Sequence, residues 1–362
     1  MSGIPTYDAI KFPEHIRTIL ITGAGGFVGQ KLTQLLLKYA PDVKLLLTDV
    51  VQPPTFGVSD ESKLKAVKAD LGDTAAVKSL FEGEKIGLVY ALHGIMSGGS
   101  EANFELGYAV NVDSHLNVLR ATHAHATETG QTGDKKPVYV FVSSLAIYGG
   151  PGCGPLDHVD PRKTPLYPGT SYGIEKNIME LYVYDYGRKG YLDTRSVRLP
   201  TVCIRSGAPS SAASSFVSGL IREPLQNIRT TLPIASSPSD PNINNYPLYC
   251  TKVTTVLRNI AYAGVMPESA FPAGEGRSIN LPGVRVTPGQ MLEALKKYGG
   301  DEAFKLVDYK IDTAVQAICK TWAGDYDSTI SQGMGFQVDD KDEGYNEAVE
   351  EFIEQELGGL KK

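Results

Sequence analysis

Residues 18–39 contain the feature that most constrains the fold of this chain. They begin with an apolar segment of strand length, TILIT, pass through a glycine-rich turn and continue with FVGQKLTQLLLKY, which has helical spacing of apolar residues. Gly23, Gly26 and Gly29 suit, in turn, a tight turn, close approach of a phosphate to the backbone, and close packing of helix on strand. A helix N-terminus also attracts anions. The segment therefore predicts a dinucleotide-binding unit; a glycine-rich turn without a ligand is the alternative.

An acidic residue follows at the distance that such a unit requires. Asp49 ends the next apolar segment, VKLLLTD, 20 residues after Gly29. A carboxylate there accepts hydrogen bonds from both ribose hydroxyls and repels a 2′-phosphate, and the next three residues, VVQ, include no Arg or Lys. We therefore expect NAD rather than NADP, although a capping or solvated acid is the alternative. In KADLGD, Asp70 and Leu71 are expected at the adenine edge, unless Asp70 only forms a turn.

Strand-like and helical segments alternate along the first two-thirds of the chain. IGLVYAL, PVYVFVSS and DTRSVRLP have strand length, and helical patterns cover residues 101–127 and 171–187. This alternation is typical of βαβ units. It predicts an α/β fold: a Rossmann-type, doubly wound parallel sheet with a smaller, irregular C-terminal substrate-binding domain. The expected division is a NAD-binding domain at 17–205 with a return near 245–275, a substrate-binding cap at 206–244 and 276–345, and terminal extensions at 1–16 and 350–362.

The composition argues against several kinds of partner. The net charge is −6 and there is no basic stripe, so we expect neither nucleic acid nor an anionic membrane as a partner. No apolar segment approaches the ~18 residues of a membrane span, and the N-terminal segment lacks the apolar core of a signal peptide. The four cysteines have no metal-binding spacing. We therefore expect a soluble cytoplasmic protein with reduced thiols, no metal site and a small-molecule partner.

Three residues suggest redox chemistry on a hydroxyl group. Tyr172 and Lys176 lie four residues apart in PGTSYGIEK, so both leave one face of the predicted helix. A free tyrosine has a pKa near 10, and a nearby ammonium lowers that pKa by favouring phenolate. The phenolate can then remove a hydroxyl proton while hydride leaves the same carbon. Ser144, at the end of a predicted strand, can stabilise the substrate oxygen.

These motifs together resemble the extended short-chain dehydrogenase/reductase family, part of the NAD-dependent epimerase/dehydratase superfamily. The matching segments span residues 18–205 and include TGAGGFVG, NVDSHLNVL, SSLAIYGG, PGTSYGIEK and RLPTV. The resemblance implies that Ser144, Tyr172 and Lys176 are catalytic and that a homodimer forms through helices near 101–127 and 171–187. It also implies that Tyr172 and Lys176 contact the cofactor, together with Phe27, Val28, Asn111 and Leu199.

Further segments resemble one branch of that family, the D-erythronate dehydrogenases. They are SGGSEANFELGYAVN, the long stretch from GYLDTRSVRLP to GLIREPL, and TWAGDYD. This resemblance implies NAD-dependent oxidation of the 2-hydroxyl of a small sugar acid to the 2-oxo acid, with Ser97, Ser144 and Thr201 lining the substrate pocket. A carboxylate substrate needs a cationic partner. Arg222 is the first candidate and Arg205 the second, with a structural ion pair as the alternative for either.

Other functions remain open on sequence grounds. They are a sugar or sugar-nucleotide epimerase or dehydratase that holds NAD tightly, a reductase of a ketone-bearing metabolite, and a dinucleotide-sensing protein without turnover. Thr201 stands where sugar-nucleotide members of the family usually carry Asn, which weighs against the first. His93, in VYALHGIMSGG, either touches the nicotinamide end or the substrate, or is a core histidine. Residues 210–216, SSAASSF, either offer hydroxyls and amides to the substrate or form a linker.

Overall fold

The computed structural model describes residues 10–210, 212–272 and 276–359. The outer parts of the two expected terminal extensions, and Ser211 of the 210–216 segment, lie outside the described residues.

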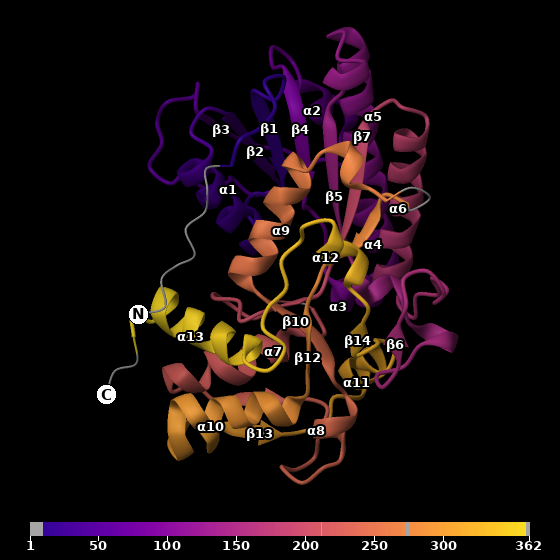
Figure 1. Cartoon of the computed structure of the whole chain (residues 1–362). Helices are drawn as coiled ribbons and strands as arrows, with labels where there is room; N and C mark the ends of the chain where they lie inside the picture. Colours follow the sequence, from indigo (N-terminus) through magenta and orange to yellow (C-terminus); the bar gives the residue numbers. More distant parts are fainter. Residues whose placement is uncertain (1–9, 211, 273–275, 360–362) are drawn as a thin grey trace.

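A parallel sheet of seven strands forms the larger part of the molecule (Figure 1). Its order is β11-β7-β5-β4-β1-β2-β3, and every neighbouring pair is parallel. The order reverses between β1 and β4, and ligands bind beside such a switch point, at the carboxyl ends of the strands. The predicted doubly wound Rossmann-type sheet is therefore confirmed. The strands are β1 (Thr18–Thr22), β2 (Lys44–Asp49), β3 (Leu64–Lys68), β4 (Ile86–Ala91), β5 (Val138–Ser144), β7 (Asp193–Leu199) and β11 (Ser278–Asn280).

Helices cover both faces of this sheet, as Figure 1 shows. Successive residues of β1 enter different cores: Ile19 and Ile21 face one side, and Leu20 faces the other. Both faces of the sheet are therefore buried, which explains why the strands are continuous apolar segments in the sequence. On the Ile19 side lie α1 (Phe27–Tyr39) and α9 (Val253–Val265); on the Leu20 side lie α2 (Thr74–Ser79), α5 (Ser114–Glu128) and α6 (Ser171–Arg188).

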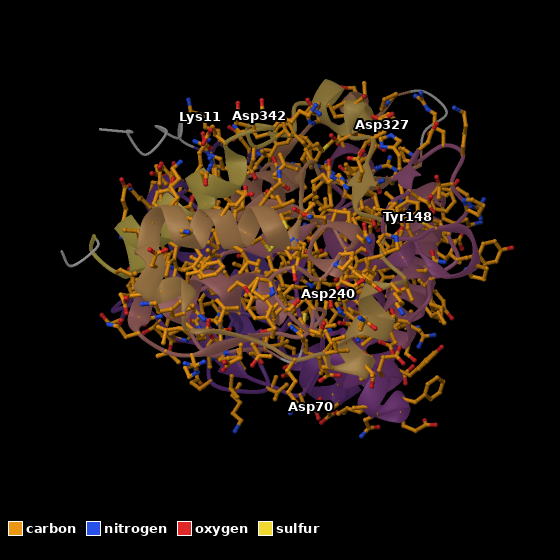
Figure 2. All side chains as sticks on the ribbon, turned by 90° about the horizontal axis from the view of Figure 1, so that it is seen from below. Lys11, Asp70, Tyr148, Asp240, Asp327 and Asp342 are labelled. Atoms are coloured by element: carbon orange, nitrogen blue, oxygen red, sulfur yellow. The ribbon has the colours of Figure 1, made fainter. Side chains whose placement is uncertain are left out.

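A second group of elements, which we call the cap, lies at one end of the sheet (Figure 1). It has its own apolar core, to which Val217, Leu295 and Phe352 belong. Figure 2 views the molecule from this end, with Asp240 near the centre and Asp70 at the rim. The main cap elements are β8 (Thr201–Cys203), α7 (Ser215–Arg222), β9 (Thr230–Leu232), α8 (Asn242–Asn245), β10 (Leu248–Lys252), β12 (Val284–Val286), α10 (Pro288–Phe304), β13 (Val307–Tyr309) and α13 (Gly344–Glu356).

The chain crosses between the two parts several times. After β10 it returns to the large sheet as α9, and β11 then pairs with β7 before β12 joins β10. The cap closes with α11 (Thr313–Cys319), β14 (Asp325–Tyr326) and α12 (Thr329–Gly333), and β14 pairs with β6 (His158–Val159). The domain boundaries expected from the sequence remain a proposal.

The two long helices expected from the sequence differ in regularity. Residues 171–187 form α6, whose start is capped by the Thr170 side chain. The region 101–127 is instead broken into α3 (Ser97–Ala102), α4 (Phe104–Tyr108), a π-helical turn (Ala109–Asp113) and α5. Turns of π-helix inside an α-helix often occur at functional sites. Within the described part of the chain, no helix has the length and apolarity that a membrane span requires.

Candidate active site

The three glycines form a tight turn and the closely packed start of α1. Gly23 has a φ of +69°, and a Cβ there would lie 2.6 Å from the His93 backbone nitrogen. A Cβ on Gly29 would lie 2.2 Å from the Gly23 carbonyl oxygen, so α1 packs against the turn at a distance only glycine permits. Gly26 is exposed at the N-cap of α1. The backbone amides at this helix start are thus open to an anion.

Asp49 lies directly beside this loop, at the end of β2. The Gly25 N–H donates to Asp49 Oδ2 at 2.9 Å, which fixes the half-buried carboxylate next to the start of α1. An acceptor in this position suits the ribose hydroxyls of NAD. Phe27 and Val28 form the first turn of α1, and Val28 also lines the cavity described below. The residues of this region therefore fit the cofactor.

The expected adenine contacts have different surroundings. Asp70 is exposed and accepts a hydrogen bond from the Gly72 N–H at 2.8 Å, which is an Asx turn. The Leu71 side chain is buried in the core under α5, while its carbonyl accepts from Asn117 at 3.1 Å. Asp70 therefore has both a turn-forming role and an exposed carboxylate beside the strand ends.

A cavity of about 190 Å³ lies where the carboxyl ends of β5 and β7 meet the cap. Its wall brings together residues that are far apart in the sequence. Eight of the predicted or candidate site residues line it: Val28, Ser97, Ser144, Tyr172, Lys176, Leu199, Thr201 and Arg205.

Local packing places Tyr172 beside Ser144. Ser144 ends β5 and caps the following short 3₁₀ turn by accepting from the Ala146 N–H at 3.1 Å. A Cβ on Gly173 would lie 2.2 Å from the Ala146 carbonyl oxygen, so the start of α6 is seated on this turn. Burial raises the pKa of Tyr172 to about 12, opposed by its hydrogen bond with Ser144 and by the charge of Arg205.

Lys176 lies one helical turn behind Tyr172. Its ammonium donates to the Val142 carbonyl at 3.0 Å and lies 5.8 Å from the centre of the Tyr172 ring. Burial lowers the pKa of Lys176 to about 8, and the charges of Glu175 and Glu180 oppose this shift. The expectation that the phenol has a lowered pKa is therefore wrong for this state, because burial raises the pKa and the cation that opposes the rise is Arg205. To form a phenolate at neutral pH, Tyr172 would need a further positive charge nearby, such as that of an oxidised nicotinamide.

Asn111 and His93 both form hydrogen bonds with protein groups, and Asn111 is the more buried of the two. Asn111, in the π-helical turn, is fully buried, and its side chain bonds the backbone of Ile95 and the side chains of Ser100 and Glu175. His93 is held between the hydroxyls of Thr22 at 2.7 Å and Ser114 at 3.0 Å. Burial lowers the pKa of His93 to about 3, so the ring is neutral. His93 is half-buried, with both ring nitrogens engaged by protein hydroxyls, and it lies outside the cavity lining.

The two candidate arginines have different positions. Arg205 lines the cavity, and its guanidinium donates to Ser210 Oγ at 3.2 Å. Arg222 lies outside the cavity lining: it pairs with Glu223 and donates to the Arg205 carbonyl at 2.8 Å. The structure thus places Arg205, rather than Arg222, near Tyr172. Arg222 instead holds the backbone of Arg205.

The serine-rich segment contributes to the same wall. Ala212 and Ser214 line the cavity, and the Ala213 N–H donates to Ser97 Oγ at 3.2 Å. This contact ties the segment to α3.

Sequence reasoning missed the aromatic part of the wall. Trp322, Tyr249 and Tyr326 line the cavity from the C-terminal third of the chain. A Cβ on Gly149 would lie 2.0 Å from the Thr321 carbonyl oxygen, so the segment before Trp322 is docked on the loop that follows β5. The only sequence signal was TWAGDYD, which served as a point of resemblance without a local role. Among the described residues, no group of His, Cys, Asp or Glu is arranged to hold a metal ion.

A dinucleotide loop at the switch point and a tyrosine flanked by serine and lysine define an NAD-dependent oxidoreductase that acts on a CH–OH group. Residues 19–235 match the model of the NAD dependent epimerase/dehydratase family, and the chain belongs to that family.

Three similar proteins cover nearly all of the chain. It is 34% identical to a protein named D-erythronate dehydrogenase of Cupriavidus necator, over 95% of this chain and 99% of that protein. It is 31% identical to a protein of the same name from Haemophilus influenzae, over 94% of this chain and 99% of that protein. The crystal structure of a nucleoside-diphosphate-sugar epimerase from Agrobacterium tumefaciens matches with a TM-score of 0.82 and 30% identity over 100% of both chains.

Proposed function

We propose that this enzyme oxidises the 2-hydroxyl of D-erythronate, or of a closely related small sugar acid, to the 2-oxo acid with NAD. The observation that carries the proposal is that Arg205 opens onto the same small cavity as Tyr172 and Ser144. A guanidinium beside the reacting groups suits the carboxylate of a hydroxy acid. The two relatives named D-erythronate dehydrogenase support the same substrate class.

In the mechanism that we propose, each side chain has one task. Arg205 binds the substrate carboxylate, and Ser97 and Thr201 hydrogen-bond the remaining hydroxyls. Ser144 donates to the oxygen on C2, and the Tyr172 phenolate removes the proton from that oxygen as the C2–H bond breaks. Lys176 holds positive charge behind the phenol. When bound, NAD would supply the hydride acceptor and the positive charge of its oxidised ring.

The alternative with the most specific support is a sugar-nucleotide epimerase, because the similar Agrobacterium tumefaciens protein carries that name. Such an enzyme keeps its cofactor through each cycle and releases no NADH. The volume of the cavity, about 190 Å³, favours a small acid over a nucleoside diphosphate sugar. Reduction of a ketone-bearing metabolite is the same reaction in the opposite direction and uses the same side chains.

We also propose that the enzyme is a cytoplasmic homodimer paired through α4, α5 and α6. Several large apolar side chains are exposed on α4 and α6, with Leu181 63% and Phe104 56% exposed. Exposed apolar side chains gathered on neighbouring helices are typical of a contact surface. The four cysteines are buried free thiols, which suits a reducing compartment. Light scattering on a size-exclusion column tests the dimer, with Leu181→Glu expected to give monomers.

The reaction is tested by absorbance at 340 nm with purified enzyme, NAD and a panel of hydroxy acids led by D-erythronate, with NADP in parallel. NADH formation with D-erythronate supports the proposal. Retained NAD without NADH release across the panel would favour the epimerase. Turnover with another acid alone would keep the reaction class and replace the substrate.

A further inference from the structure

Glu175 is a buried carboxylate at the centre of the site that the proposed mechanism does not use. It is fully buried on α6, between Tyr172 and Lys176 in sequence. Its Oε2 accepts from Asn111 Nδ2 at 2.7 Å and from Ser100 Oγ at 2.9 Å. Its Oε1 has no hydrogen-bond partner among the described residues. A buried, half-satisfied charge is costly, and such a group calls for a functional explanation.

Through Asn111, Glu175 holds the loop that follows β4. Asn111 donates to the Ile95 carbonyl at 3.1 Å and accepts from the Ile95 N–H at 3.0 Å, so both backbone groups of Ile95 are engaged. Met96 and Ser97, which come next, line the cavity. The hydrogen bonds therefore link the catalytic helix to one wall of the substrate pocket.

The backbone on the other side of Glu175 is adapted to this carboxylate. A Cβ on Gly107 would lie 2.3 Å from Glu175 Oε1, so α4 approaches at a distance that only glycine permits. The π-helical turn that follows α4 carries Asn111. The carboxylate is thus enclosed by elements that leave room for it and for no larger group.

Glu175 immediately precedes Lys176 in the sequence, and it forms no salt bridge with a cation among the described residues. The other acid that acts on Lys176, Glu180, is held by Arg198 at 2.7 Å. His93 and His115 face Lys176 from the β4 loop and α5, and burial keeps the pKa of both rings low, so both are neutral. Arg205 acts on Tyr172 from the cap.

We propose that Glu175 is a positioning residue that, through Asn111, ties the residue 92–97 loop to α6 beside Tyr172 and Lys176. Its negative charge then also acts on the Lys176 ammonium and the Tyr172 phenol. This inference rests on the proposed function for its kinetic test, and its structural test is independent of the substrate.

The kinetic test is the pH profile of kcat/KM for D-erythronate in Glu175→Gln, which removes the charge and keeps the size. Without the carboxylate, the ammonium of Lys176 deprotonates at lower pH, and the phenol of Tyr172 ionises at lower pH because the nearby negative charge is gone. Both limbs of the profile are expected to move to lower pH, on the order of one pH unit. Asp185→Asn, at an exposed position of the same helix, is the matched control and leaves both limbs in place.

The structural test uses Glu175→Asp, which keeps the charge and shortens the reach. Its two pH limbs are expected near those of the wild type, while KM rises several-fold and backbone amides of residues 92–97 exchange hydrogen faster. Unmoved limbs in Glu175→Gln, or unchanged exchange in Glu175→Asp, would overturn the inference. If the wild-type enzyme oxidises no acid of the panel, the proposed function fails, and the exchange experiment alone decides the inference.

Discussion

Replacing Asp49 by alanine tests where the ribose of the cofactor lies. Asp49 accepts from the Gly25 N–H at 2.9 Å, and among the described residues its Oδ1 has only a 3.5 Å contact with the Val51 N–H, so the carboxylate has free acceptor capacity. Two hydrogen bonds from ribose hydroxyls to a charged group contribute at least ~1.5 kcal/mol each. Their loss of about 3 kcal/mol corresponds to roughly 100-fold weaker NAD binding.

The assay is a titration with NADH and NADPH, followed by energy transfer from Trp322, the one tryptophan of the chain, which lines the cavity. NADPH binding is expected to change far less, because the variant loses repulsion of the 2′-phosphate together with the hydrogen bonds. Asp49→Asn separates charge from shape, since its amide oxygen still accepts from Gly25. Equal weakening of NADH and NADPH in Asp49→Ala would refute the reasoning, because it would mean that Asp49 only orders the glycine loop.

Three further variants test other parts of the site. Tyr172→Phe is expected to lower kcat by ~10²–10⁴-fold with unchanged NADH affinity, because only the phenolic oxygen is lost; unaltered turnover at 340 nm would exclude the proposed base. Arg205→Gln is expected to raise KM for the acid about tenfold or more, and an unchanged KM would move the carboxylate elsewhere. Gly29→Ala forces a Cβ to 2.2 Å from the Gly23 carbonyl, which costs ~1–3 kcal/mol. Thermal unfolding should show a lower Tm for Gly29→Ala than for the control Gly333→Ala. A Cβ added at Gly333 would have no described neighbour within 4 Å.

The glycine unit and the sheet were predictable from the sequence because they rest on local patterns. The helix expected at residues 27–39 has those bounds in the structure, since the turn and the apolar spacing define both of its ends. Parallel strands that are buried on both faces can also be recognised in the sequence, because they are continuous apolar segments. The spacing of apolar residues did not predict the break between α4 and α5. The reason is that Gly107 and the π-helical turn pack around the Glu175 carboxylate, which lies on another helix.

The cap side of the site could not be derived in this way. Arg205 and Arg222 both lie in polar or mixed segments, and only the fold decides which one reaches the cavity and which one pairs with Glu223. Trp322 comes from a short loop near the C-terminus and reaches the cavity because Gly149 admits the neighbouring backbone. Contacts of this range depend on docking between elements, which local spacing does not encode.

Lys176 and Tyr172, to which the proposed mechanism gives catalytic roles, both have pKa values shifted by burial. The pKa of Lys176, about 8 in the fold, lies below its ordinary value of 10.5, so the unfolded chain binds more protons between these two pH values. The free energy of unfolding therefore rises with pH through that window. At neutral pH the buried ammonium lowers it by about 3 kcal/mol. The pKa of the Tyr172 phenol is raised to about 12 even with Arg205 nearby, so the phenol is protonated at neutral pH. In the proposed mechanism, the phenol would therefore act as a base only with additional positive charge beside it, and bound NAD would supply that charge.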